Sequence, residues 1–153
     1  MAYRLYGVIG NGVVLGGLRH PSMHGMQLLP CGFGLCHVRI QVAMDEPLAE
    51  LPDALPRLTE SVLGYLEVVS EQAPVVYLAA DGDSEAAGGW HGGALELGPL
   101  RSGRGTAPRL FRRRETGAVN AALEWIHAPR SNGRDRAATL GLTQRDDWDP
   151  GAT

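Results

Sequence analysis

The strongest constraint on the fold is an amphipathic helix that is followed almost at once by a buried strand. Apolar residues recur in this stretch at three- and four-residue spacing, which places them on one stripe of a helix. They are Leu55, Leu58, Val62, Leu66 and Val69. The helix is expected to end near Ala73, because the residue before Pro74 is disfavoured in the α region. The apolar segment 75–80 then predicts a buried strand.

The N-terminal half supplies further strands. Residues 3–9 predict a strand, and Gly10-Asn11-Gly12 predicts a tight turn into a return strand over 13–15. Residues 35–42 alternate between apolar and polar side chains, which is typical of a half-buried strand. The apolar face of that strand comprises Cys36, Val38, Ile40 and Val42.

The C-terminal half adds a hairpin and a second helix. Segments 85–90 and 94–97 predict two strands joined through residues 91–93. Thr116 is suited to cap a helix that runs to about His127. The inner stripe of this helix comprises Val119, Ala122, Leu123 and Ile126.

The order of strands, helix, strands and helix predicts an α+β fold. We expect an antiparallel or mixed sheet with two main helices packed on one face. A length of 153 residues predicts a single domain over 1–153. Within it, the segment of about 99–115 is expected to form a flexible Arg-rich loop, and the chain to end in an acidic tail.

Charge is distributed unevenly along the chain. Residues 1–99 hold four Arg and eleven acids, whereas residues 100–153 hold ten Arg and six acids. The net charge of −3 argues against direct binding to nucleic acid. No apolar run is long enough to cross a bilayer and no secretory signal is evident, so the expected compartment is the cytoplasm, with no membrane partner.

Two patterns, one of glycines and one of cysteines and histidines, are candidates for a functional site. The glycines of segment 7–12 resemble a dinucleotide-binding loop, but such a loop needs a helix directly after the strand, and we expect a hairpin instead. A zinc or thiol site would draw on five residues of irregular spacing. These are His20, His24, Cys31, Cys36 and His37. We expect no metal, no cofactor and no catalytic residue, with Cys36 as a buried small apolar side chain. A metal-dependent or thiol enzyme that uses Cys31 or Cys36 stays open as an alternative.

Several stretches resemble a group of small bacterial proteins that are found beside polymorphic-toxin genes and are regarded as immunity proteins. The resemblance spans most of residues 28–149, with gaps. It rests on the apolar segment 29–35, the strand and hairpin at 73–81 and 84–99, the Gly-x-x-Asn helix at 117–123, and the closing Leu-Gly-Leu…Asp-Trp motif at 140–148. The chain departs from the group at 81–84 and in the Arg-rich stretch 101–114.

The resemblance implies an immunity protein that binds and neutralises a cognate toxin. The predicted partner contacts are three acids and one aromatic residue near the hairpin, together with two arginines of the Arg-rich segment. They are Asp81, Asp83, Glu85, Trp90, Arg112 and Arg113. A homodimer is also compatible with this function. A second alternative is a nucleic-acid-binding accessory protein that uses the run from Arg101 to Arg114.

Overall fold

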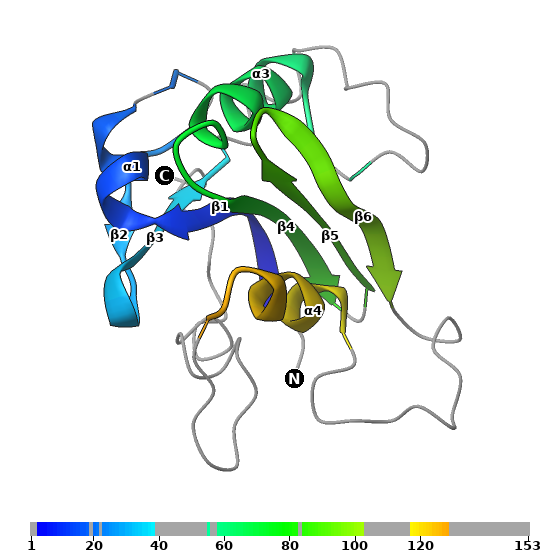
Figure 1. Ribbon diagram of the computed structural model, residues 1–153. Coiled ribbons are helices and arrows are strands. Elements are labelled where there is room, and N and C mark those ends of the chain that lie inside the picture. The colour runs from blue at the N-terminus through cyan, green and yellow to red at the C-terminus, as the bar shows by residue number, and fades with distance from the viewer. Residues whose placement is uncertain are drawn as a thin grey trace.

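The chain folds around one six-stranded sheet. The computed structural model describes residues 3–18, 20–21, 23–38, 55, 58–82, 84–102 and 117–128. The strands are β1 (Tyr3–Asn11), β2 (Gln27–Leu28), β3 (Phe33–His37), β4 (Val75–Gly82), β5 (Ser84–His91) and β6 (Ala94–Ser102). They lie in the order β2-β3-β1-β4-β5-β6, and each neighbouring pair is antiparallel (Figure 1). The predicted α+β class with an antiparallel sheet is confirmed.

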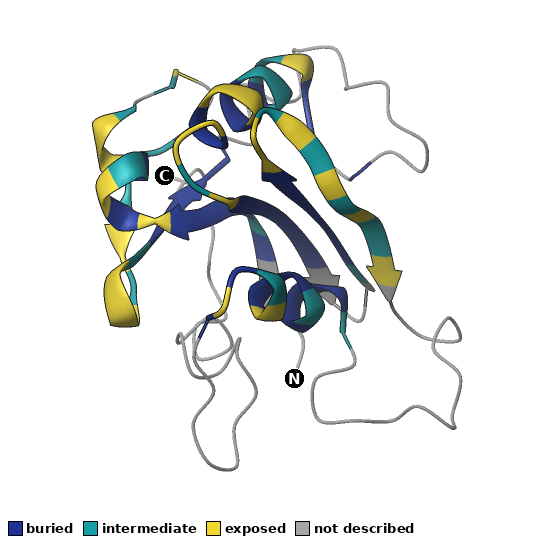
Figure 2. Cartoon of the chain, viewed as in Figure 1, coloured by how far each residue is buried: buried dark blue, intermediate teal, exposed yellow. Residues whose placement is uncertain are grey.

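Helices cover both faces of this sheet. The elements are α1 (Gly12–Gly17), the short 3-10 turn Pro30–Gly32, α3 (Glu60–Val69) and α4 (Ala118–Trp125). Alternate side chains of β4 enter different apolar clusters: Val75 and Tyr77 pack with α3, while Val76 and Leu78 pack with α4. The two main helices exist as predicted, but they lie on opposite faces rather than on one. A strand that is apolar on both sides requires cover on both sides, and Figure 2 shows the central strands buried.

The predicted amphipathic helix is confirmed as α3, but it begins later than expected, at Glu60. Thr59 caps α3, since its Oγ1 accepts a hydrogen bond from the backbone N of Val62 at 3.2 Å. All the predicted stripe residues are buried, including Leu55 and Leu58, which precede the helix. The predicted strand at 75–80 follows as β4, so the helix packs against the strand that comes next in the chain.

The predicted turn at Gly10-Asn11-Gly12 is wrong. The chain passes from β1 directly into α1, because the side chain of Asn11 accepts hydrogen bonds from the backbone N of Val13 and of Val14, at 2.9 and 3.3 Å. Asn is a good N-cap as well as a turn residue. The expected return strand at 13–15 is therefore helical, and β3 and β4 pair with β1 in its place.

For the strand predicted at 35–42, the expectation that only one face is buried is wrong. In β3 both Leu35 and Cys36 are buried, as is His37, so the strand is covered on both faces. Residues 39–42 lie outside the described residues. The β5–β6 hairpin is confirmed, with a turn at Gly92-Gly93, and β6 runs on to Ser102, into the segment expected to be loop.

The remainder of the predicted Arg-rich loop and the acidic tail lie outside the described residues. No helix within the described residues is long and apolar enough to cross a membrane.

Candidate functional site

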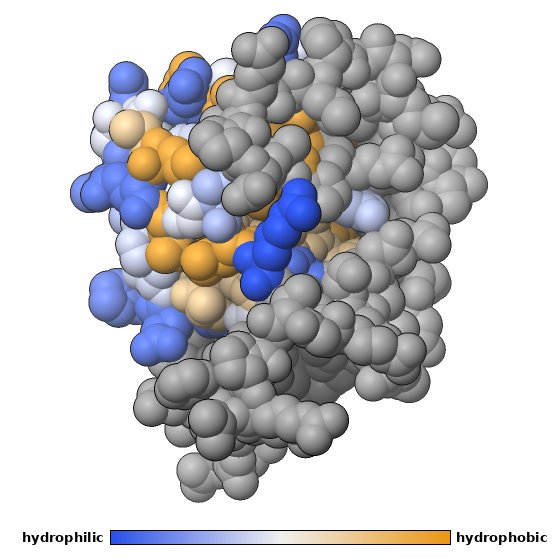
Figure 3. Space-filling model, turned by 90° about the vertical axis from the view of Figure 1, so that its right-hand side faces the viewer, coloured by the Kyte–Doolittle hydropathy of each residue, from blue (hydrophilic) through white to orange (hydrophobic). Residues whose placement is uncertain are grey.

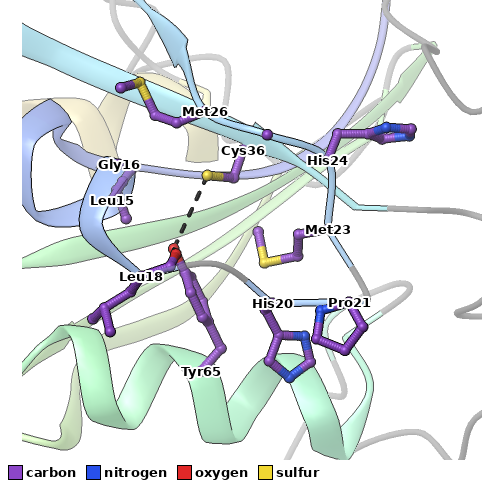
Figure 4. A pocket seen from close by; sticks show the side chains of 11 residues that line it. Leu15, Gly16, Leu18, His20, Pro21, Met23, His24, Met26, Cys36 and Tyr65 are labelled. Atoms are coloured by element: carbon purple, nitrogen blue, oxygen red, sulfur yellow. Dashed lines mark hydrogen bonds between the residues drawn. The ribbon is translucent and has the colours of Figure 1, made fainter.

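A cavity of about 480 Å³ opens between α1, β3 and α3. We call it the sulfur cavity, because three sulfur-bearing side chains line it (Figure 4). Its walls come from four parts of the chain: α1, the segment 20–26, β3 and α3. The residues that line it include Leu18, His20, Met23, His24, Met26, Cys36 and Tyr65.

A thiol and a phenol meet at the floor of the sulfur cavity. Tyr65 Oη donates a hydrogen bond to the carbonyl oxygen of Leu18 at 3.2 Å, and Cys36 Sγ lies 4.0 Å from the same phenol oxygen. Because the single phenol hydrogen is given to Leu18, the thiol is the donor toward Tyr65. Burial raises the pKa of the Cys36 thiol, and burial together with the neighbouring Cys36 raises the pKa of Tyr65. Both groups are therefore neutral at pH 7.

The segment 20–26 forms the outer wall of the cavity. The ring of His20 meets Tyr65 edge-on, with ring centroids 5.7 Å apart. Met23 forms an isolated antiparallel bridge to Val38, and it is only 4% exposed. Met26 lies over Gly34, where an added Cβ would come within 2.8 Å of Met26 Sδ. The glycine in β3 thus leaves the space that this thioether occupies.

A second cavity, also of about 480 Å³, lies at the end of the sheet where β1 stops and β4 starts. It brings together Cys31, His91, Glu96 and His127, which are far apart in the sequence. His91 Nδ1 lies 3.2 Å from Glu96 Oε2. Cys31 is exposed and has a positive φ of 64°, a conformation that few non-glycine residues adopt.

The five residues considered for a zinc or thiol site are thus divided. His20, His24 and Cys36 line the sulfur cavity, Cys31 lines the sheet-end cavity, and the buried His37 lines neither. Across the described residues, no group of three His, Cys, Asp or Glu side chains is arranged to hold a metal ion. The prediction that Cys36 is a buried small side chain is confirmed.

Three of the predicted partner contacts, Trp90, Glu85 and Asp81, lie within the described residues. Trp90 is 1% exposed and belongs to the core cluster beneath α3, so its assignment to a partner surface is wrong in this fold. Glu85 Oε1 accepts a hydrogen bond from the backbone N of Val119 at 3.0 Å, and thereby caps α4. Asp81 is the next-to-last residue of β4, where its backbone pairs with that of Ser84.

The other predicted contacts, Asp83, Arg112 and Arg113, lie outside the described residues, and so does Thr116, the predicted cap of α4. In the structure the N-cap of α4 is Gly117, which offers no side chain. Glu85, from another part of the sequence, supplies the cap, and no pattern in the sequence around α4 indicates it.

Sequence reasoning missed Tyr65, Met23 and Met26. Tyr65 falls on the buried stripe of α3 between Val62 and Val69, and a hydroxyl at such a position was the available signal, since a buried phenol normally finds a hydrogen-bond partner. The two methionines carried no comparable signal, because Met is an ordinary core residue.

Comparisons of the chain with protein-family models, with curated proteins and with solved structures found no match. The function must therefore be argued from the fold and its surfaces.

Proposed function

We propose that this chain is a cytoplasmic immunity protein that binds and neutralises a cognate toxin with a basic surface. The observation that carries the proposal is an acidic face formed by Glu60 and Glu67 of α3 and by Glu71 in the turn that follows it, all of which are exposed. These glutamates lie seven and four residues apart, which aligns them along one side of the helix. The resemblance of the sequence to presumed immunity proteins supports the same function.

The acidic face carries charges that the helix itself disfavours. Glu67 and Glu71 lie near the C-terminal end of α3, where the helix dipole favours cations, and no basic residue occupies its last turn. Like charges four residues apart also cost a few tenths of a kcal/mol. A basic partner relieves both penalties on binding, so the arrangement favours association with cations.

An apolar anchor lies beside these charges. Val68 is 54% exposed between Glu67 and Glu71. The β5–β6 turn is fixed against the end of the helix, since the backbone N of Gly92 donates to Ser70 O at 2.8 Å and that of Gly93 to Ser70 Oγ at 3.0 Å. Apolar contacts surrounded by charges are typical of protein interfaces.

Acidic residues also outnumber basic ones on the rest of the described surface. Glu96 and Glu124 are exposed as well, and the one arginine whose side chain is described is Arg101. On the side of β6, a hydrophobic band lies among hydrophilic side chains (Figure 3). Leu95, Leu97 and Leu100 of β6 are partly exposed, Leu95 beside the cluster beneath α3 and the other two beside the cluster beneath α4. A basic nuclease would meet an acidic surface with apolar anchors, and binding would cover its substrate site.

The test is a binding measurement with the product of the adjacent toxin gene. We expect a tight complex that weakens with salt, and protection of cells that express the toxin. Glu67→Lys with Glu71→Lys should slow association by about tenfold or more, because surface charge steers encounter. Glu124→Lys on α4 is the matched control and should have a smaller effect. A complex that forms equally fast with all variants would assign binding to another surface, and the absence of any complex would refute the proposal.

A thiol-dependent activity is the second candidate. It is supported by the sheet-end cavity, where Cys31 shares a wall with the His91–Glu96 pair, the elements of an activated thiol. The test is the alkylation rate of Cys31 at pH 7. His91→Ala should slow it several-fold if the imidazole assists, and an unchanged rate removes this candidate.

A further inference from the structure

We propose that the sulfur cavity is a binding site for Cu(I), held by the thiolate of Cys36 and the thioethers of Met23 and Met26, with His20 at the rim. This inference is independent of toxin binding, because it concerns a different part of the molecule from the acidic face of α3.

The donors come from two neighbouring pieces of chain, the segment 20–26 and β3. Figure 4 shows Cys36, Met23 and His20 following one another along the wall of the cavity, with Met26 beyond Cys36 and turned toward α1, and with His24 directed away. Cys36 and Met23 are each 4% exposed, and the bridge between Met23 and Val38 holds the segment 20–26 against β3. Thioether side chains are flexible, so a change of rotamer at Met26 would bring its sulfur atom toward an ion bound at Cys36.

The chemistry of the donors selects a soft metal. Thiolate and thioether sulfur prefer Cu(I), whereas Zn²⁺ takes thiolate, imidazole and carboxylate and makes little use of thioethers. Among the described residues, the cavity lining contains no Asp or Glu. The described residues also lack any three His, Cys, Asp or Glu placed to share a metal. A zinc site therefore has too few ligands, while a Cu(I) site has a sufficient set of sulfur atoms.

The charge of the complex points the same way. Cu(I) displaces the thiol proton of Cys36 to solvent, and one thiolate with one monovalent cation leaves the cavity neutral. A divalent ion with the same ligands would leave a net positive charge among Leu15, Leu18 and Met23, where an unpaired charge is costly. The thiol already directs its hydrogen at Tyr65 inside the cavity, so the metal takes a place that this hydrogen occupied.

The test is an anaerobic titration of the full chain with Cu(I) in competition with a coloured Cu(I) chelator, repeated with Ag(I), which resists oxidation. We expect one ion per chain and a rise in Tm on binding. Cys36→Ser should weaken binding at least tenfold, and Met23→Leu should weaken it by a smaller factor while keeping the apolar volume. Cys31→Ser is the matched control and should bind as the parent chain does.

Three results would overturn the site. They are the absence of Cu(I) and Ag(I) binding, binding that is lost in Cys31→Ser rather than Cys36→Ser, and Zn²⁺ affinity equal to that for Cu(I). Met23→Leu keeps the test decisive if Cys36→Ser fails to fold, because Leu fills a similar space without a sulfur atom.

Discussion

At the scale of single residues, the contact between Glu85 and Gly117 shows how a distant side chain can determine a residue choice. A Cβ at position 117 would push the Glu85 carboxylate aside, so glycine leaves room for this contact. Glycine then leaves the start of α4 without a local cap, and the carboxylate supplies one through Val119. The negative charge is also favourable at a helix N-terminus.

Replacing Glu85 should therefore destabilise α4. We expect Glu85→Ala to lower the free energy of unfolding by about 1 kcal/mol, the usual cost of losing an N-cap. Urea unfolding measures it. Glu124→Ala, an exposed change within α4, is the control and should stay within about 0.5 kcal/mol of the parent chain. Equal effects from the two changes would show that the Glu85 cap adds nothing.

The buried Cys36 thiol predicts a loss of stability at alkaline pH. Its folded pKa is raised above the ordinary 9.0, so below that value the thiol is neutral in both the folded and unfolded states. As the pH rises through the ordinary pKa, only the unfolded state ionises, and folding loses free energy until the folded pKa is reached. Tyr65 acts in the same direction at higher pH.

Urea unfolding at several pH values from 7 to 10 measures this loss. The decline above pH 9 should be shallower in Cys36→Ala than in the parent chain, whatever the baseline cost of the lost side chain. Cys31→Ala, which removes an exposed thiol instead of a buried one, is the matched control. A slope that is the same with and without Cys36 would contradict the prediction.

At the scale of elements, the junction between β1 and α1 shows where local patterns are ambiguous. Gly-Asn-Gly suits both a hairpin turn and a helix cap, and the choice depends on which strands are available to pair. Here Gly10 pairs with Gly34 of β3 on one side and Val75 of β4 on the other. Both partners lie far along the chain, so the sequence around Asn11 does not contain the deciding information.

The cap at Asn11 can be tested directly. Asn11→Ala should cost about 1 kcal/mol of stability, because the backbone N of Val13 and of Val14 lose their side-chain acceptor. Asn11→Asp retains an acceptor oxygen and should retain most of the stability. Thermal unfolding of the two variants at equal concentration compares them, and equal losses would show that the side-chain bond is unimportant.

At the scale of the whole molecule, two clusters share one sheet. Leu66 belongs to the cluster beneath α3 and Leu123 to the cluster beneath α4, and both are fully buried. Because the two clusters use alternate side chains of the same strands, they should lose their structure together. The molecule should unfold in a single transition despite its two-sided core.

Truncation on either face tests this coupling. Leu66→Ala and Leu123→Ala should each cost about 2–5 kcal/mol, and each should shift the whole urea transition, monitored both by tryptophan fluorescence and by circular dichroism. Val68→Ala, on the exposed side of α3, is the control and should change stability little. Two separate transitions in either core variant would mean that the faces fold independently.

Much of the fold could be predicted from the sequence, and the site could not. Periodicity located α3, β4, the β5–β6 hairpin and the inner stripe of α4, because each pattern is local. It did not place α3 and α4 on opposite faces, since that depends on both sides of β4 being apolar within a sheet whose order was unknown. The sulfur cavity joins Met23, Cys36 and Tyr65 through tertiary packing, which no spacing rule encodes.

The central position of β1 also bears on how the chain is made. This strand leaves the ribosome before both of its neighbours, β3 and the much later β4, whose pairing joins Tyr3 to Gly82. At typical synthesis rates of roughly 5–20 residues per second, the strand waits about 4–14 s for β4. Until then β1 can pair with β3, but its other edge stays unpaired. We infer that the sheet is completed only after β4 has emerged, and that chaperone binding before that point centres on β1.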